Sequence, residues 1–246
     1  MRKIFFSFLF SFFLLSSQSQ LVSTLNTARD CTYMSPAERE MIYEINRVRN
    51  DPASYLPYLV PMLKDAQEIL HAYGNGAPNY SLTYTMERED GREIKTVDTT
   101  WHNINEERVK ALSTLIEDLK KLTKLSVLFP DRGIYRAARK HAADQRIHNW
   151  QLMHTGSDGS NPWNRIITFS PQMTFGNENI AGRTVDKTAV PRDIVLQLLI
   201  DEGIPGYGHR YNLLDPQWTH VACTTDTFEG MWWWIQNFGI KRGSKK

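Results

Sequence analysis

Two histidines and two acidic residues in the second half of the chain are the residue types that could do chemistry together. His154 opens the turn-rich segment HTGSDGS, and Glu178 lies in the segment GNEN. Glu202 follows an apolar stretch, and His209 lies in the segment GYGHR. Two imidazoles and two carboxylates can hold a divalent metal ion or form a hydrogen-bonded acid–base cluster. Spacing alone leaves open whether the four meet in space or are separate polar surface residues.

The position of Glu202 depends on the helix that precedes it. Val195 and Leu199 lie on the same helical stripe as Glu202, whereas Leu198 lies on the neighbouring stripe that ends at Asp201. Periodicity therefore leaves open which of the two carboxylates faces inward. A carboxylate on an inward stripe needs a partner or a solvated cleft.

The first half of the chain reads as helices around a hairpin. Ser35-Pro36 followed by Glu38 has the pattern of a capping box, and it predicts a helix that ends at Asn50-Asp51-Pro52. Further helices are expected at 55–70 and 105–121, with a β-hairpin around Asp90-Gly91 between them.

The second half predicts two helices, two loops and a closing pair of strands. Asp131 can cap a helix that runs to Trp150, on whose inward stripe His141 and His148 are expected as hydrogen-bonded core histidines. The segments 154–165 and 175–182 are rich in Gly, Asn, Ser and Pro and predict loops. A helix is expected to end at Gly203, and HVACTTDT and MWWWIQNFG predict an antiparallel pair. Helices mixed with antiparallel strands indicate one α+β layered domain.

Several motifs in a fixed order resemble the CAP superfamily, which includes cysteine-rich secretory proteins, antigen 5 and plant pathogenesis-related proteins of group 1. They are HAADQ, HTGSDGS, ENIAG, LLIDEG…GHRYNLLDP and the final strand with Gln236-Asn237-Phe238. The wording of SDGS and IDEG…GHR is most similar to that of secreted microbial-type members. The resemblance implies a three-layer α-β-α sandwich with a central, mainly antiparallel sheet, as a single CAP domain over 34–240.

The resemblance also implies a cleft that contains His154, Glu178, Glu202 and His209. In the family, the paired histidines can hold a divalent ion, often zinc, so His154 and His209 are the expected metal ligands. Neutral imidazoles suit Zn²⁺, and nearby carboxylates can fix the imidazole tautomer. The segment 59–124 departs from the compact family pattern and is expected to be an insertion.

The N-terminus has the pattern of an export signal. Arg2 and Lys3 precede a short apolar run that is followed by SSQSQ, so residues 1–19 are expected to be a signal peptide of a secreted protein. In an oxidising compartment Cys31 and Cys223 are expected to form a disulfide, with two buried free thiols as the alternative.

Charge and hydropathy exclude several kinds of partner. The 246 residues carry 29 Lys plus Arg and 27 Asp plus Glu, for a formal net charge of +2. Two of the bases lie in residues 1–19 and four in the basic tail 241–246, so residues 20–240 carry 23 bases and 27 acids, or −4. No nucleic-acid partner is expected from this balance. No segment is apolar and long enough to predict stable membrane insertion.

Three functions fit these residues. The first is a non-enzymatic extracellular binding module for a lipid or sterol, a glycan or a protein, and family precedent favours it. The second is a metal-dependent hydrolase with Glu178 or Glu202 as the general base. The third is an interaction protein that acts through residues 59–124. The HExxH motif of zincin proteases is absent from the sequence.

Overall fold

The computed structural model describes residues 24–75, 79–89, 92–102, 104–148, 153–184 and 190–243. The chain divides into two compact units. The first, here called the sheet unit, comprises Met1–Ser54, Thr123–Leu199 and His209–Lys246, and the second, the hairpin unit, comprises Tyr55–Leu122 and Ile200–Gly208. The expected signal peptide 1–19 and the end of the tail lie outside the described residues.

The sheet unit is built on a four-stranded sheet in the order β3-β5-β6-β4. The strands are β3 (Phe129–Pro130), β4 (Met173–Thr184), β5 (His220–Phe228) and β6 (Met231–Lys241). Only β3 pairs in parallel, with β5, and the other neighbours are antiparallel. Glu229 and Gly230 join β5 to β6 with φ values of 48° and 74°, as a two-residue hairpin loop requires. The predicted closing strand pair is confirmed.

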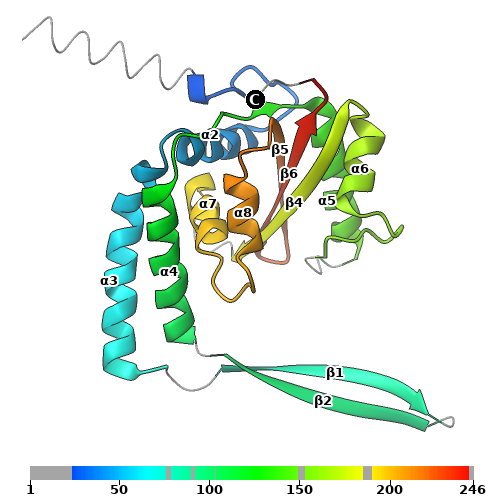
Figure 1. Ribbon diagram of the computed structural model, residues 1–246. Helices are drawn as coiled ribbons and strands as arrows, with labels where there is room; N and C mark the ends of the chain where they lie inside the picture. The colour runs from blue at the N-terminus through cyan, green and yellow to red at the C-terminus, as the bar shows by residue number, and fades with distance from the viewer. Residues whose placement is uncertain are drawn as a thin grey trace, which may run out of the picture. The chain divides into compact units, whose positions relative to one another are not determined.

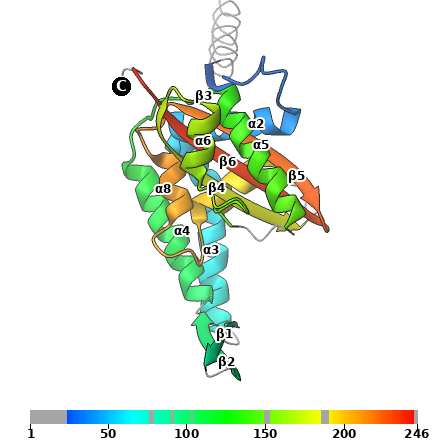
Figure 2. The same cartoon turned by 90° about the vertical axis from the view of Figure 1, so that its right-hand side faces the viewer.

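Helices cover both faces of this sheet, and the predicted three-layer α-β-α arrangement is confirmed (Figures 1 and 2). One layer consists of α5 (Arg132–Ile147) and α6 (Pro162–Phe169). Ala138 and Ala142 of α5 pack on Ile180 and Ile235 of the sheet. The other layer consists of α2 (Pro36–Asn50), α7 (Pro191–Ile200) and α8 (Gly208–Leu214). On that face Gln236 of β6 donates to the sulfur of Met41 in α2 at 3.2 Å.

Helix ends follow the capping chemistry of the sequence. Ser35 and Glu38 form the predicted capping box at the start of α2. Asn161 and Asn164 form a second one at the start of α6, with Pro162 in the first turn. The prediction of a loop through residue 165 was therefore wrong for its last four residues, because Asn-Pro here starts a helix rather than a turn.

The prediction of a loop at 175–182 was also wrong, since this segment lies within β4. Its glycines serve the strand by letting other groups approach closely. A β-carbon on Gly176 would lie 2.7 Å from Ile166 Cδ1 and 2.8 Å from the carbonyl oxygen of Phe238. The buried Asn179 side chain is satisfied by Gln236 and Asn212, so these polar residues are compatible with a strand interior.

The predicted disulfide between Cys31 and Cys223 was wrong, because both cysteines are free thiols. Cys223 lies fully buried in β5, directly opposite Gln236 of β6. Burial, followed by the negative charge of Glu38, raises the pKa of the Cys223 thiol well above its usual value. A thiol that stays protonated does not enter thiol–disulfide exchange.

The hairpin unit contains two helices and a two-stranded antiparallel sheet. Its elements are α3 (Leu56–Tyr73), β1 (Asn79–Glu89), β2 (Arg92–His102) and α4 (Ile104–Lys121), and the short 3-10 helix Pro52–Tyr55 leads into it from the sheet unit. Ala111, Leu112, Leu115, Ile116 and Leu119 of α4 are buried, in line with the apolar periodicity of its sequence. The strands confirm the predicted hairpin, whose turn lies outside the described residues. The expected domain boundaries, 34–240 with an insertion at 59–124, stay a prediction.

Candidate functional site

Glu178 lies inside the sheet unit, on the face of β4 that carries α5 and α6. It is directly opposite Asn237 of β6, and Ile180, two residues along on the same face, packs against α5. Only 2% of Glu178 is exposed. A carboxylate buried this deeply needs a cationic partner or several hydrogen-bond donors.

Arg165 of α6 is the cationic partner of Glu178. Its Nη2 lies 3.1 Å from each carboxylate oxygen, and Arg165 is itself 2% exposed. Sequence reasoning missed this arginine. It stands next to Ile166 in a short helix, and nothing in the pattern distinguishes it from an ordinary surface arginine. The ion pair is a buried salt bridge between β4 and α6.

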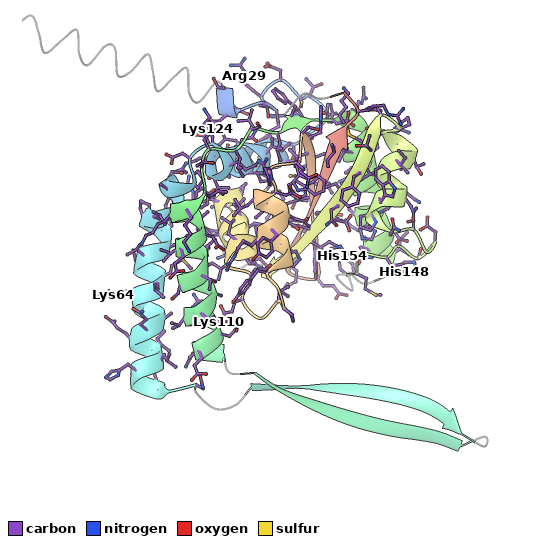
Figure 3. The ribbon with its side chains drawn as sticks, in the orientation of Figure 1. Arg29, Lys64, Lys110, Lys124, His148 and His154 are labelled. Carbon is purple, nitrogen blue, oxygen red and sulfur yellow. The ribbon has the colours of Figure 1, made fainter. Side chains whose placement is uncertain are left out.

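His154 lies in the loop after α5 (Figure 3), and its imidazole contacts the carboxylate of Glu178. Its Nδ1 lies 3.1 Å from Glu178 Oε1, and its side chain is 48% exposed. Since the carboxylate accepts, we assign the proton to Nδ1, which leaves Nε2 as the acceptor. Arg165 Nη2 also donates to the carbonyl oxygen of His154 at 2.9 Å.

His141 of α5 lies on the interior side of Glu178. The side chain is fully buried, and Nε2 donates to the carbonyl oxygen of Met153 at 2.8 Å. This atom also lies 3.6 Å from Glu178 Oε1. The prediction of a hydrogen-bonded core histidine is confirmed for His141 and was wrong for His148. His148 is 53% exposed beside Asp144, because it follows the last turn of α5.

Residues 153–160, here called the His154 loop, are held by side chains from two helices. From α5, Asp144 accepts from the backbone N–H and the hydroxyl of Ser157, and Lys140 pairs with Asp158. From α6, Arg165 donates to the carbonyl oxygen of Ser160 at 2.7 Å. The loop that carries His154 is therefore fixed at both ends.

The other two predicted residues have different surroundings. Glu202 lies in the hairpin unit, in the turn after α7, and pairs with Arg108 of α4 at 2.7 Å. His209 is the second residue of α8, and its carbonyl oxygen accepts from Asn179 Nδ2 at 3.3 Å. The structure thus joins His154 to Glu178, and the four-residue cleft stays a prediction.

The side chains present limit what metal site could form. Among the described residues there is no group of three or more His, Cys, Asp or Glu side chains placed to hold an ion. Both oxygens of Glu178 already accept from Arg165. The donor set that fits is an imidazole oriented by a carboxylate, which is the usual arrangement for a histidine that ligates a metal.

Comparison with models of known protein families shows which family the chain matches. The model of the cysteine-rich secretory protein family, CAP, matches residues 101–238, more than half of the 246 residues.

The chain belongs to the CAP family.

Two solved structures resemble this CAP chain. An outer surface protein from Borrelia burgdorferi is 20% identical with a TM-score of 0.40, and the match covers 56% of this chain and 95% of that one. An extracellular protein containing an SCP domain from Bacillus anthracis is 15% identical with a TM-score of 0.38, and the match covers 72% of this chain and 71% of that one. No curated protein matches the sequence.

The buried histidine makes the stability of this CAP domain depend on pH. Burial lowers the pKa of His141, and the charge of Arg165 lowers it further, against the opposing effects of Glu178 and Asp144. As pH falls below about 6.5, the unfolded chain binds a proton at His141 that the folded chain does not bind. The free energy of unfolding should therefore fall as pH is lowered below about 6.5, by at most about 1.4 kcal/mol per pH unit from this residue.

Urea unfolding of the wild type and of His141→Gln over this pH range tests the effect. Gln keeps a donor for the carbonyl of Met153 but does not titrate, so the variant should show a shallower decline than the wild type. Equal slopes for the two proteins would contradict the assignment of the proton uptake to His141.

Proposed function

We propose that this CAP chain is a non-enzymatic extracellular binding module. The observation that supports this most is the buried ion pair between Glu178 and Arg165. It makes the most deeply placed carboxylate of the predicted cleft a structural group. The family assignment supports an extracellular-type protein, and the signal-like residues 1–19 support export.

A general base must be able to reach the proton that it removes. The side chain of Glu178 has no exposed surface, and both its oxygens accept from Arg165 Nη2. Glu202, the other candidate base, is bound to Arg108 at 2.7 Å. Because each carboxylate already has a cationic partner, neither is placed as a free base for hydrolysis.

His154 is the part of the site that a ligand can reach. Its imidazole is half exposed, and its orientation is set by Glu178 from behind. A fixed polar group at the edge of a largely buried site provides direction to a binding interaction without chemistry. The ligand classes that fit the family are a lipid or sterol, a glycan or a protein. In the described residues, no helix has the length and apolarity needed to cross a bilayer.

Hydrolysis assays test the non-enzymatic proposal. The purified chain, with Zn²⁺ present, is incubated with libraries of peptides and esters beside Glu178→Gln, Glu202→Gln and the exposed control Glu229→Gln. All four proteins should release product at the rate of the blank, because the two candidate bases are engaged in ion pairs. Turnover that saturates with substrate and is lost only in Glu178→Gln or Glu202→Gln would show that the chain is a hydrolase.

A weak divalent-metal site at His154 is a second part of the proposal. The orientation of its imidazole by Glu178 favours it, because Nε2 is left as the acceptor. His209 is the expected second ligand from the family pattern. Two protein ligands hold an ion less firmly than the four of a structural zinc site, so the ion is exchangeable.

Calorimetric titration with Zn²⁺ tests this site. The wild type should bind one ion near pH 7.5, and His154→Ala and His209→Ala should each abolish the heat of binding. Binding should weaken as pH falls, since protonated imidazoles are not ligands. The exposed His148→Ala is the matched control and should bind as the wild type does. Unchanged titration of His154→Ala would remove the metal site from the account.

A further inference from the structure

Three exposed arginines of α5 form no ion pair with a carboxylate in the part of the chain that the structure describes, although Arg139 donates to the hydroxyl of Thr224 at 3.4 Å. Arg132, Arg136 and Arg139 are exposed and follow each other at i, i+4 and i+7, so they form a single stripe along the helix. Figure 2 looks onto this layer of the sheet unit. At 1.5 Å per residue the stripe is about 10 Å long. Here these three residues are called the arginine stripe.

Asp131 at the start of α5 and Glu38, which contacts Tyr135 of α5, already accept hydrogen bonds from other donors. Asp131 accepts from two backbone N–H groups of α5 and from Ser170 and Gln172. The buried Glu38 accepts from Ser35, Tyr135, Thr224 and Thr225. Among the described residues, no carboxylate forms an ion pair with any arginine of the stripe, whereas Arg146 and Lys140 farther along α5 pair with Asp226 and Asp158.

The spacing of these arginines lowers the stability of the helix. Arg132 and Arg136 are like charges at i, i+4, as are Arg136 and Lys140, and such pairs destabilise a helix. Residues 20–240 carry a formal charge of −4, so a local row of bases is not a consequence of composition. A local arrangement that opposes stability is expected where it serves binding.

Two of the guanidinium groups lie over aromatic rings. The Cζ of Arg132 lies 5.7 Å from the centroid of the Tyr33 ring, and that of Arg136 lies 4.8 Å from the centroid of the Phe169 ring. Stacking on an aromatic face fixes the plane of a guanidinium and leaves its N–H edge outward. Less conformational entropy is then lost when an anion binds, and the planar fork suits sulfate or phosphate oxygens.

We propose that the arginine stripe binds a linear sulfated glycan. This partner rests on the proposed extracellular location, where such glycans occur. A narrow stripe flanked farther along the helix by Asp158 and Asp226 suits a thin chain that lies along α5. A flat anionic membrane would also meet those acidic residues, and duplex DNA would face the net negative body of the protein. The exposed Ala143, which follows the stripe on the same face, is not an apolar anchor for a bilayer.

The test is titration of the purified chain with a heparin oligosaccharide of defined length at about 0.15 M salt. The variant Arg132→Gln/Arg136→Gln/Arg139→Gln should bind about tenfold more weakly or worse, because charge-assisted contacts to sulfate are removed. The matched control is Lys64→Gln/Lys110→Gln/Lys124→Gln, which changes the net charge equally at exposed positions labelled in Figure 3. The control should stay within about twofold of the wild type.

Titrations with three other ligands test whether the stripe prefers a sulfated glycan to other anionic partners. The desulfated oligosaccharide, vesicles with anionic phospholipid and duplex DNA should all bind more weakly than the sulfated chain. Equal affinity of the stripe variant and the wild type for heparin would overturn the site, and tighter binding of vesicles or DNA would overturn the choice of glycan. If the triple variant does not fold, the single variant Arg136→Gln replaces it, and it should bind heparin more weakly than the wild type does. In addition, heparin should slow the amide hydrogen exchange of residues 132–139 in the wild type. An unchanged affinity of Arg136→Gln together with an unchanged exchange rate would overturn the proposal. Hydrolysis in the assays above would refute the non-enzymatic function and leave this binding result intact.

Discussion

The buried pair of Glu178 and Arg165 is the interaction on which the site depends. A carboxylate in the middle of a sheet is strongly destabilising unless a cation or several donors meet it. Arg165 meets it from α6, which requires α6 to pack against β4 at this point. The same guanidinium binds the carbonyl oxygens of His154 and Ser160, so one side chain joins a strand, a helix and a loop.

Within the sheet unit, the buried residues of the site have a structural role, and His154 is the residue that a ligand can reach. Glu178, Arg165 and His141 are buried and lie against one another, and they set the position of His154 at the edge. On the other face of β4, Asn179 binds the backbone of His209 and the side chain of Asn212. Hydrogen bonds therefore hold the imidazole of His154 on one face of β4 and the backbone of His209 on the other. The arginine stripe lies on the outer surface of α5, and a ligand there would not need to enter the cleft.

Local signals in the sequence predicted the elements that depend on local chemistry. The capping box at Ser35 follows from side chains that bind the neighbouring backbone, and the closing strand pair follows from two apolar, aromatic-rich runs separated by a short segment with a glycine. Helical periodicity placed His141 in the core. These features need no knowledge of the rest of the fold.

Features that depend on distant partners were missed. Segment 175–182 is composed like a loop and becomes a strand because β6 pairs with it and because groups from α6 and β6 occupy the space above its glycines. Arg165 becomes buried only because Glu178, thirteen residues later, is its partner. The rule that secreted cysteines pair did not account for the burial of Cys223 in the sheet. The family resemblance led to the prediction that Glu178 and His154 lie in one cleft, whereas the hydrogen bond between them was found only in the structure.

A double-mutant cycle on Glu178→Gln and Arg165→Met tests the central claim most directly. Each single change should lower the free energy of unfolding by about 3 kcal/mol, because it leaves one buried group without its partner. The double variant should be more stable than the sum of the single effects predicts, with a coupling energy of about 2 kcal/mol. The exposed pair Lys140 and Asp158 serves as the control cycle and should show weaker coupling. Additive effects of the Glu178 and Arg165 changes, to within about 0.5 kcal/mol, would contradict the account.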